Sequence, residues 1–479
     1  MPDRPNVVFI LADQLRACSL PLYGEDQIET PNIDRLAAEG TTFTNMVSTC
    51  PVCTPYRSML LTGRHPQTTG HVMNFVRTRH DEIGLGDVFA RAGYRTAWIG
   101  KWHLHTGSFP QVEGPDFVPE GRDRLGFEFW RGYNFHTRYF DGWVNRGDWR
   151  NEQWEGYETR ALNRYAFEFM DAAGEEPFLC CLSPHQPHGS SGRLAPEDCL
   201  ERVPESLRLP DNVPERWLER GGGGSGNWGL SAPEMYRHYL AMTIALDDMV
   251  GELLDYLERT GRAQNTLFIF TSDHGSQVGA QDEYPWTKMR PYEESLLVPL
   301  VARRPGVFEA GATCEALTAP VDLMPTLCGL CELPVPRSVE GHDLSDAWRG
   351  RPGAFEQDAV LTMNFSATHD YLQDGKEWRG VRTKEHSYAR WRDGREQLFD
   401  LRSDPLEMED LAGDPEYGNL RESLEGRMHE LMAALGDELV PCTSYAPWFD
   451  NYRRVVRNAR GPLGNPEAEP DWHLLGPQR

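Results

Sequence analysis

The chain has 479 residues, a formal net charge of −25 and a hydrophobic fraction of 39%. This length suits one large domain joined to a smaller one, and the hydrophobic residues suffice for a sizeable core. The acidic balance argues against a protein that binds nucleic acid or an anionic membrane, because both are polyanions. An anionic substrate would therefore need a local positive site set into a negative surface.

The first residues carry no pattern typical of a targeting or membrane-spanning segment. Only five apolar residues, 7–11, follow the polar start, and this is far too few for a signal sequence or a transmembrane helix. We therefore expect a cytoplasmic protein that does not bind membranes. The ten cysteines are sparse for so long a chain, which differs from a secreted disulfide framework.

The first two thirds of the chain alternate strand-like and helical patterns. The clearest helix covers residues 232–259, where apolar residues recur four and three apart after an N-cap at Ser231. Strands that alternate with helices predict an α/β fold with a large, mainly parallel sheet sandwiched by helices. We interpret the glycine-rich stretch 221–226 as a loop inside this domain. The predicted strands, buried on both faces, are residues 7–11, 96–99, 178–182 and 267–270.

The pattern changes near residue 365. Residues 378–383, 387–391 and 396–401 are typical of short strands, and Asp393-Gly394 between the last two predicts a hairpin. A helix with one apolar stripe follows at residues 420–435. The predicted division is a catalytic domain, residues 1–365, a small C-terminal α+β subdomain with an antiparallel sheet, residues 366–440, and an aromatic-rich tail, residues 441–479, that packs on the body or on a partner subunit of a homo-oligomer.

Polar side chains follow the C-terminal end of each of the four predicted strands. These ends lie along one edge of an open parallel sheet, which is where ligands bind. Oxygen ligands suit a hard cation such as calcium, and lysine and histidine beside the cation suit a tetrahedral anion. Each residue alone has a simpler explanation, such as a helix cap or a surface lysine. The prediction of a binding site therefore rests on the presence of such residues at several strand ends at once. The residues are Asp13, Gln14, Lys101, His103, His185, Asp273 and His274.

Two Cys-x-x-Cys pairs occur in the chain. Cys328 and Cys331 lie in an apolar run, which predicts a core helix. Cys50 and Cys53 would suit a redox dithiol or half of a zinc site. No thioredoxin-like pattern surrounds them and no second pair has the spacing of zinc ligands, so a redox or zinc protein is kept only as a remote alternative.

The twelve residues that start at Cys53, CTPYRSMLLTGR, resemble the signature of the formylglycine sulfatases of the alkaline phosphatase superfamily. That signature is C-x-P-x-R followed by L-T-G-R, and its cysteine is oxidised to formylglycine after synthesis. A second signature of the family fits residues 93–103, GYRTAWIGKWH, and shorter elements extend the resemblance over residues 5–412. The resemblance implies an alkaline-phosphatase-like fold and an enzyme that hydrolyses sulfuric esters.

The resemblance also implies a role for each matching residue. Cys53 would become the nucleophile, and Arg57 would hold it and offset its charge. One divalent cation would be bound, calcium first and manganese as the alternative. Asn74 would be a further substrate contact. The groups that bind the sulfate oxygens and assist the leaving group would be Lys101, His103, His185 and Lys288, and the metal ligands would be Asp13, Gln14, Cys53, Asp273 and His274.

The chemistry explains why the cysteine must be altered by a formylglycine-generating enzyme. A thiol nucleophile would leave a thiosulfate that the enzyme clears with difficulty. Hydrated formylglycine is a geminal diol, and one of its hydroxyls, activated by the metal, attacks sulfur and expels the alcohol. A base then takes the proton of the second hydroxyl, so that the C–O bond breaks, sulfate leaves and the aldehyde returns.

Three positions depart from the usual pattern of the family. Gln14 and His274 stand where Asp and Asn are frequent, and Tyr56 stands where a small residue is common. The Asp-Gln and Asp-His choices also occur in the related phosphonate monoester hydrolases, whereas the pair Lys101 and His103 favours a sulfatase. We predict hydrolysis of a sulfated carbohydrate or of an aryl or alkyl sulfate, with a phosphonate monoester or phosphodiester hydrolase as the alternative.

Overall fold

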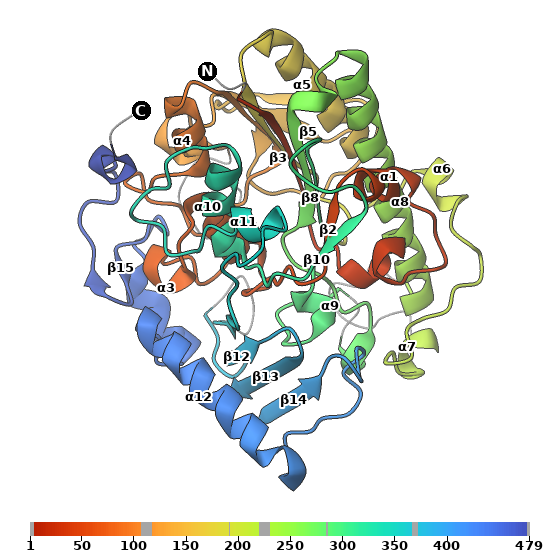
Figure 1. Ribbon diagram of the computed structural model, residues 1–479, viewed down its shortest axis with the longest axis vertical. Helices are drawn as coiled ribbons and strands as arrows, with labels where there is room; N and C mark the ends of the chain where they lie inside the picture. Colours follow the sequence, from red (N-terminus) through yellow and green to blue (C-terminus); the bar gives the residue numbers. More distant parts are fainter. Residues whose placement is uncertain are drawn as a thin grey trace.

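A ten-stranded sheet runs through the centre of the computed structural model (Figure 1). Its strand order is β10-β2-β9-β8-β1-β7-β3-β4-β5-β6. The structure describes residues 4–106, 117–190, 192–219, 230–283, 286–365 and 372–476. The glycine-rich stretch 221–226 therefore lies outside the described residues.

The four predicted strands form the parallel middle of this sheet, which confirms the predicted fold class. β1 pairs with β7 and β8, and β3 pairs with β7, all in parallel. The strands are β1 (Asn6–Ala12), β3 (Arg95–Lys101), β7 (Phe178–Ser183) and β8 (Thr266–Ser272).

The outer strands are shorter, and several of them run antiparallel to their neighbours. The sequence analysis did not predict them, because short runs such as NEQ or ATC have no apolar pattern. These strands are β2 (Thr41–Phe43), β4 (Phe129–Tyr133), β5 (Trp143–Asn145), β6 (Asn151–Gln153), β9 (Leu300–Arg303) and β10 (Ala312–Cys314).

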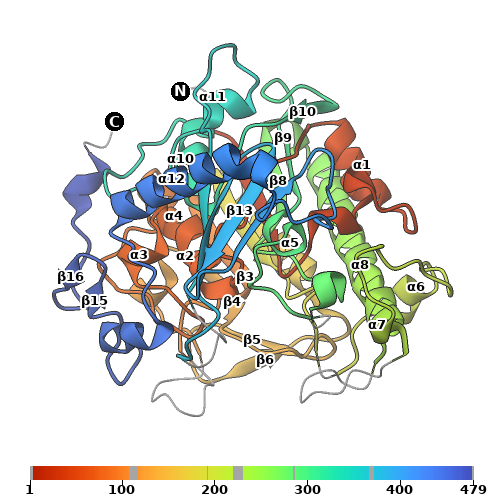
Figure 2. The same cartoon turned by 90° about the horizontal axis from the view of Figure 1, so that it is seen from below.

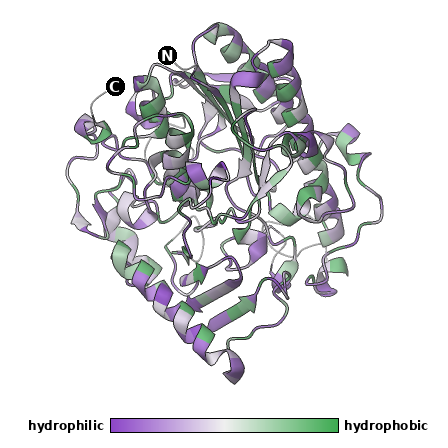
Figure 3. Ribbon diagram, in the orientation of Figure 1, coloured by the Kyte–Doolittle hydropathy of each residue, from purple (hydrophilic) through white to green (hydrophobic). Residues whose placement is uncertain are grey.

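Helices cover both faces of the sheet, so its central strands are apolar throughout (Figure 3). Val8 and Ile10 of β1 pack toward α8, whereas Val7 and Phe9 pack on the opposite face toward α2 and α10. The bounds are α1 (Pro31–Ala38), α2 (Cys53–Thr62), α3 (Pro66–Thr69), α4 (Leu85–Arg91), α5 (Glu158–Ala173), α6 (Glu197–Leu200), α7 (Arg216–Glu219), α8 (Ala232–Arg259), α9 (Glu293–Leu296), α10 (Pro320–Leu330) and α11 (Ser345–Trp348).

Two helix predictions are confirmed in detail. α8 covers the predicted residues, and Ser231 and Glu234 form a reciprocal capping box at its start. Cys328 lies buried inside α10 and Cys331 is buried at its end, as expected for a core helix. Among the described residues, no helix has both the length and the apolar composition that crossing a bilayer requires.

A second sheet of four antiparallel strands, with α12 packed across it, forms the lower part of the molecule (Figures 1 and 2). β11 precedes the predicted boundary at residue 365, although it belongs to this sheet. The division into a catalytic domain and a C-terminal subdomain stays a prediction. The small sheet and α2 share one hydrophobic cluster, so the two parts pack against each other. The elements are β11 (Val360–Asn364), β12 (Trp378–Arg382), β13 (His386–Trp391), β14 (Glu396–Asp400) and α12 (Gly418–Leu435).

The tail lies along the catalytic part of the chain, and its described residues include the short strands β15 (Arg457–Asn458) and β16 (Gly461–Pro462). The Asn458 amide donates to the carbonyl oxygen of Thr68 at 2.8 Å. The Arg91 guanidinium lies 3.6 Å from the ring centroid of Trp472. Tyr445 and Trp448 of the tail are buried within this chain, whereas Tyr452 is exposed.

The ion pair of Arg379 and Asp437 ties β12 to the segment after α12, and we expect it to be important for stability. Its Nε–Oδ2 distance is 2.6 Å and both side chains are buried. Removing one partner of such a pair leaves an unpaired buried charge, which costs about 3–5 kcal/mol. Arg379→Ala should lower the free energy of unfolding by about this amount in equilibrium denaturation.

Arg395→Ala is the matched control, because Arg395 forms an exposed pair with Asp393. Exposed pairs contribute about 0–1 kcal/mol, so this variant should unfold nearly as the parent does. Equal losses in the two variants would contradict the role assigned to the buried pair.

Candidate active site

Strand ends and one helix start bring the predicted residues together at the carboxyl edge of the large sheet. Asp13 follows β1, Lys101 ends β3, His185 follows β7, and Asp273 and His274 follow β8. Cys53 is the first residue of α2, where free backbone N–H groups and the helix dipole favour negative charge. Parallel pairing alone thus places side chains from distant parts of the chain at one point.

Cys53 lies at the centre of this group and is buried. Its Sγ is 3.2 Å from His274 Nε2 and 4.0 Å from Asp13 Oδ1. Two ammonium groups face the same atom, Lys288 Nζ at 3.4 Å and Lys101 Nζ at 3.5 Å. The thiol sulfur marks the position that the oxygens of a formylglycine would take.

Arg57 follows one turn later on α2 and joins the two carboxylates. Its Nη2 donates to Asp13 Oδ2 at 2.9 Å and to Asp273 Oδ2 at 3.2 Å. Its Nη1 donates to the Lys101 carbonyl at 2.9 Å and to Ser183 Oγ at 2.8 Å. The guanidinium therefore fixes the ends of four strands to α2 while it compensates two buried negative charges.

Four of these residues form a candidate cation site. Asp13, Cys53, Asp273 and His274 each offer a ligand atom, and these atoms lie within 4.8 Å of one another. Burial and the nearby Asp13 raise the pKa of Asp273. Burial alone would raise the pKa of Asp13, but Lys101 and other cations outweigh burial and hold that pKa well below its ordinary value. Two close, buried carboxylates and an imidazole are a donor set that fits a divalent cation.

Gln14, the fifth predicted ligand, has its side-chain oxygen beside Lys288. Gln14 Oε1 accepts from Lys288 Nζ at 3.1 Å, and Nε2 donates to Ser276 Oγ and to the Trp286 carbonyl, each at 3.0 Å. The backbone of Gln14 is in the left-handed region, with φ 69°. The amide is thus oriented with its oxygen toward the site and its nitrogen away from it.

The lysine and one histidine of the predicted anion site are fixed by hydrogen bonds. Lys101 Nζ is 2.5 Å from Asp13 Oδ2 and 3.0 Å from His185 Nε2. His185 Nδ1 donates to the His136 carbonyl at 2.6 Å, which leaves Nε2 as the acceptor for the ammonium group. Burial, followed by the charge of Lys101, lowers the pKa of His185 well below its ordinary value.

His103 and Asn74 differ from these residues. Among the described residues, neither ring nitrogen of the buried His103 has a hydrogen-bond partner. Burial, followed by the charges of Lys101 and Arg57, lowers its pKa well below the ordinary value. Asn74 Oδ1 accepts from the backbone N–H of Thr54 at 2.9 Å. Asn74 therefore supports the first turn of α2, and its predicted contact with substrate stays a prediction.

The sequence analysis did not assign two residues of this region. His188 is half-buried, and one of its ring nitrogens lies within 4.8 Å of ligand atoms of Asp13 and His185. The sequence offered a signal for His188, because this histidine follows His185 closely after a predicted strand. Phe135 contacts the rings of His103 and His185, and no pattern in the sequence indicates this, because Phe135 lies in an irregular segment after β4.

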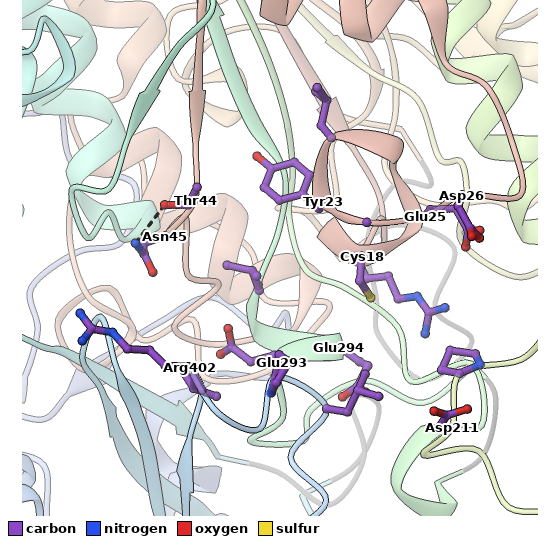
Figure 4. Close-up of a pocket in the computed structure, with 18 of the residues that line it drawn as sticks. Cys18, Tyr23, Glu25, Asp26, Thr44, Asn45, Asp211, Glu293, Glu294 and Arg402 are labelled. Atoms are coloured by element: carbon purple, nitrogen blue, oxygen red, sulfur yellow. Dashed lines mark hydrogen bonds between the residues drawn. The ribbon is translucent and has the colours of Figure 1, made fainter.

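A cavity of about 870 Å³ lies elsewhere, between the segment after β1, α9 and the turn after β14 (Figure 4). None of the candidate site residues lines it. Two ion pairs join residues that line it, Arg382 with Glu293 at 2.9 Å, and Arg208 with Asp26. We therefore place the chemistry at Cys53 and not in this cavity.

The fold and the donor set define an ester hydrolase of the alkaline phosphatase superfamily. The sulfatase family model matches residues 5–333, and a model described as N-sulphoglucosamine sulphohydrolase, C-terminal, matches residues 282–434. The chain belongs to the sulfatase family, and the enzyme is a sulfuric ester hydrolase. The predicted family and enzyme class are thus confirmed.

Relatives support the same family along most of the chain. An ulvan-active sulfatase of Formosa agariphila is 34% identical over 450 residues, which cover 91% of this chain and 83% of that protein. A structure from work on the metabolism of multiple glycosaminoglycans by Bacteroides thetaiotaomicron has a TM-score of 0.80 at 25% identity and covers 91% of this chain and 97% of that one. A phosphonate monoester hydrolase from Silicibacter pomeroyi shares the fold, with a TM-score of 0.70, 21% identity and coverage of 91% and 96%.

We expect Ca²⁺ or Mn²⁺ to raise the thermal unfolding midpoint of chelator-treated protein. A ligand that binds only the folded state stabilises it by RT ln(1 + [L]/Kd), about 2.7 kcal/mol at a hundredfold excess over Kd. Asp273→Asn should abolish this response, because it removes one of the two carboxylates. Asp346→Asn, on the exposed surface, serves as the control and should respond as the parent does. A full response in Asp273→Asn would place the cation elsewhere.

Proposed function

We propose that this enzyme hydrolyses the sulfate ester of a saccharide, with a formylglycine derived from Cys53 and one divalent cation. One observation carries the proposal: Cys53 Sγ lies 3.5 and 3.4 Å from the ammonium groups of Lys101 and Lys288, and within 4.8 Å of ligand atoms of Asp13, Asp273 and His274. Two ammonium groups and a set of possible metal ligands thus surround the side chain that would attack the ester. This is what an anionic ester and a metal-activated nucleophile require.

The residues around Cys53 would have different roles, which follow from their positions. Asp13, Gln14, Asp273 and His274 would hold the cation, which together with formylglycine supplies a strongly nucleophilic hydroxyl at neutral pH. Arg57 would keep both carboxylates in place, because it hydrogen-bonds each of them. Manganese is the alternative ion, since the His274 imidazole suits a transition metal, whereas carboxylate and amide oxygens suit either ion.

The remaining residues would bind the ester. Lys101 and Lys288 would donate to the sulfuryl oxygens, because their ammonium groups already face the nucleophile position at 3.5 and 3.4 Å. His185, whose Nε2 accepts from Lys101 Nζ, would hold that ammonium group beside the sulfuryl oxygens. His103, whose ring nitrogens lack partners among the described residues, would hydrogen-bond the ester oxygen that departs.

The saccharide assignment is supported by the relatives. One of them is named for activity on ulvan, and the structural neighbour comes from work on glycosaminoglycans. Aryl or alkyl sulfates are the other substrates that the same chemistry would serve. The substrate must be an anion small enough at its reacting end to enter a site whose residues are nearly all buried.

A phosphonate monoester hydrolase is the second candidate, favoured by Gln14 and His274. Its nucleophile and metal would be the same, and the shared fold does not separate the two reactions. The two functions differ in the group that is bound beside the leaving oxygen. Only an assay of both substrate classes distinguishes them.

The test uses protein produced together with a formylglycine-generating enzyme, with conversion of Cys53 verified by mass spectrometry. We expect turnover of 4-nitrophenyl sulfate and of sulfated saccharides to exceed that of phenyl 4-nitrophenylphosphonate. Cys53→Ala should lose at least about 10³-fold in kcat, because the covalent route disappears. Cys50→Ala is the matched control and should retain activity, because Cys50 has no part in this mechanism.

Each other outcome has a clear meaning. Faster turnover of the phosphonate would establish the second candidate and require new roles for Lys101 and His103. Equal activity of Cys53→Ala and the parent would refute the nucleophile. Equal losses of activity in Cys50→Ala and Cys53→Ala would support the dithiol or zinc interpretation instead.

A further inference from the structure

Within the described part of the chain, His103 is held in the site without a hydrogen bond to its ring. Its carbonyl accepts from Thr54 Oγ1 at 2.5 Å, and its backbone is left-handed with φ 58°. Both ring nitrogens lack a partner within the described residues. By contrast, His185 is fixed by the bond from Nδ1 to the His136 carbonyl. Something other than hydrogen bonding must therefore orient the His103 ring.

Two phenylalanine rings fill that role. The Phe75 centroid is 4.9 Å from that of His103 at an interplanar angle of 73°, and the Phe135 centroid is 4.8 Å away at 30°. Phe75 and Phe135 also contact each other edge to face, at 5.6 Å and 78°. Aromatic pairs in these geometries attract each other beyond the effect of their buried area, so together the two rings restrict the rotation of the imidazole.

Phe135 also borders the other residues of the anion site. Lys101 Nζ lies 5.2 Å from its centroid, a distance that suits a cation–π contact. The His185 ring is 5.2 Å away at 70°, and the His188 ring is 6.4 Å away at 83°. One partly exposed ring thus contacts the lysine and three histidines at the edge of the site.

We propose that Phe135 is a positioning residue that orients the His103 imidazole toward the leaving oxygen of the ester. The physical reason is that packing by a neighbouring ring orients the imidazole without using either of its nitrogens. A hydrogen-bond anchor would occupy one of them, whereas ring packing leaves both for the substrate. Buried polar atoms without partners are costly, and a substrate that pairs with the ring nitrogens, which have none among the described residues, removes that cost.

The inference rests on the proposed function and extends it to the dependence of rate on the leaving group. A 4-nitrophenolate leaves without much assistance, whereas a sugar alkoxide needs a proton or a strong hydrogen bond. Loss of the Phe135 ring should therefore slow a saccharide sulfate far more than an aryl sulfate. A general loss of folding or of metal would slow both equally.

The experiment compares Phe135→Leu with Phe135→Tyr, His103→Ala and the double variant Phe135→Leu/His103→Ala. For a saccharide sulfate we expect Phe135→Leu to lower kcat about 10- to 100-fold with little change in KM, because general acid–base assistance contributes about 10²–10⁴-fold. For 4-nitrophenyl sulfate the loss should stay within about threefold. Phe135→Tyr should recover most of the rate lost in Phe135→Leu, because it restores the ring.

The double variant supplies the decisive comparison. If Phe135 acts through His103, adding Phe135→Leu to His103→Ala costs nothing further, whereas independent effects would multiply. Phe140→Leu is the matched control, because Phe140 lies on the same segment and contacts Tyr157 rather than the site. It should leave the ratio of the two rates unchanged. Equal losses on both esters, or multiplying losses in the double variant, would overturn the proposal.

A second readout does not depend on turnover. In histidine-labelled Cys53→Ala protein, the ring signals of His103 are assigned by their absence in His103→Ala. Phe135→Leu should broaden or split these signals, and the signals of the other histidines identify a folded protein. Unchanged His103 signals would refute the role of Phe135. A parent enzyme that hydrolyses neither ester would refute the proposed function instead, and the ring signals would still decide the role of Phe135.

Discussion

The rest of the site depends on the buried guanidinium of Arg57. Asp13 and Asp273 come from adjacent parallel strands, and without a counter-charge their carboxylates would repel each other in a dry environment. Arg57 binds both, and its other nitrogen binds the ends of β3 and β7. Because Arg57 lies four residues after Cys53, the same contacts fix the first turn of α2. The position of Cys53 is therefore set by the same interaction that compensates the charges of the two carboxylates.

This arrangement explains how a protein of net charge −25 can bind an anionic ester. Three cationic side chains, Arg57, Lys101 and Lys288, gather around two carboxylates in a region from which water is largely excluded. In such a region a charge acts more strongly than on the surface, so the local field outweighs the distant surface charges. A divalent cation at the carboxylates would make the field still more positive.

The sequence predicted the middle of the sheet and most of the site for the same reason. Strands buried on both faces appear as continuous apolar runs, and polar residues directly after them mark the edge where ligands bind. The edge strands and β11 were missed, because short runs with mixed side chains carry no such pattern. Phe135 was missed because its importance comes from ring packing between segments far apart in sequence. Asn74 was expected near the substrate, but its observed partner is the start of α2.

Arg57 and the lysines also bear on the choice between a sulfate and a phosphonate. Both esters carry one negative charge, so the field around Cys53 does not separate them. They differ at one substituent, which is an oxygen in the sulfate ester and a carbon in the phosphonate. Lys101 and Lys288 direct their ammonium groups at Cys53, and a carbon substituent placed against either group accepts no hydrogen bond from it, whereas an oxygen does. A site built to hydrogen-bond an oxygen discriminates strongly against a group that lacks it. The two ammonium groups therefore favour the sulfate, although Gln14 and His274 suit either reaction.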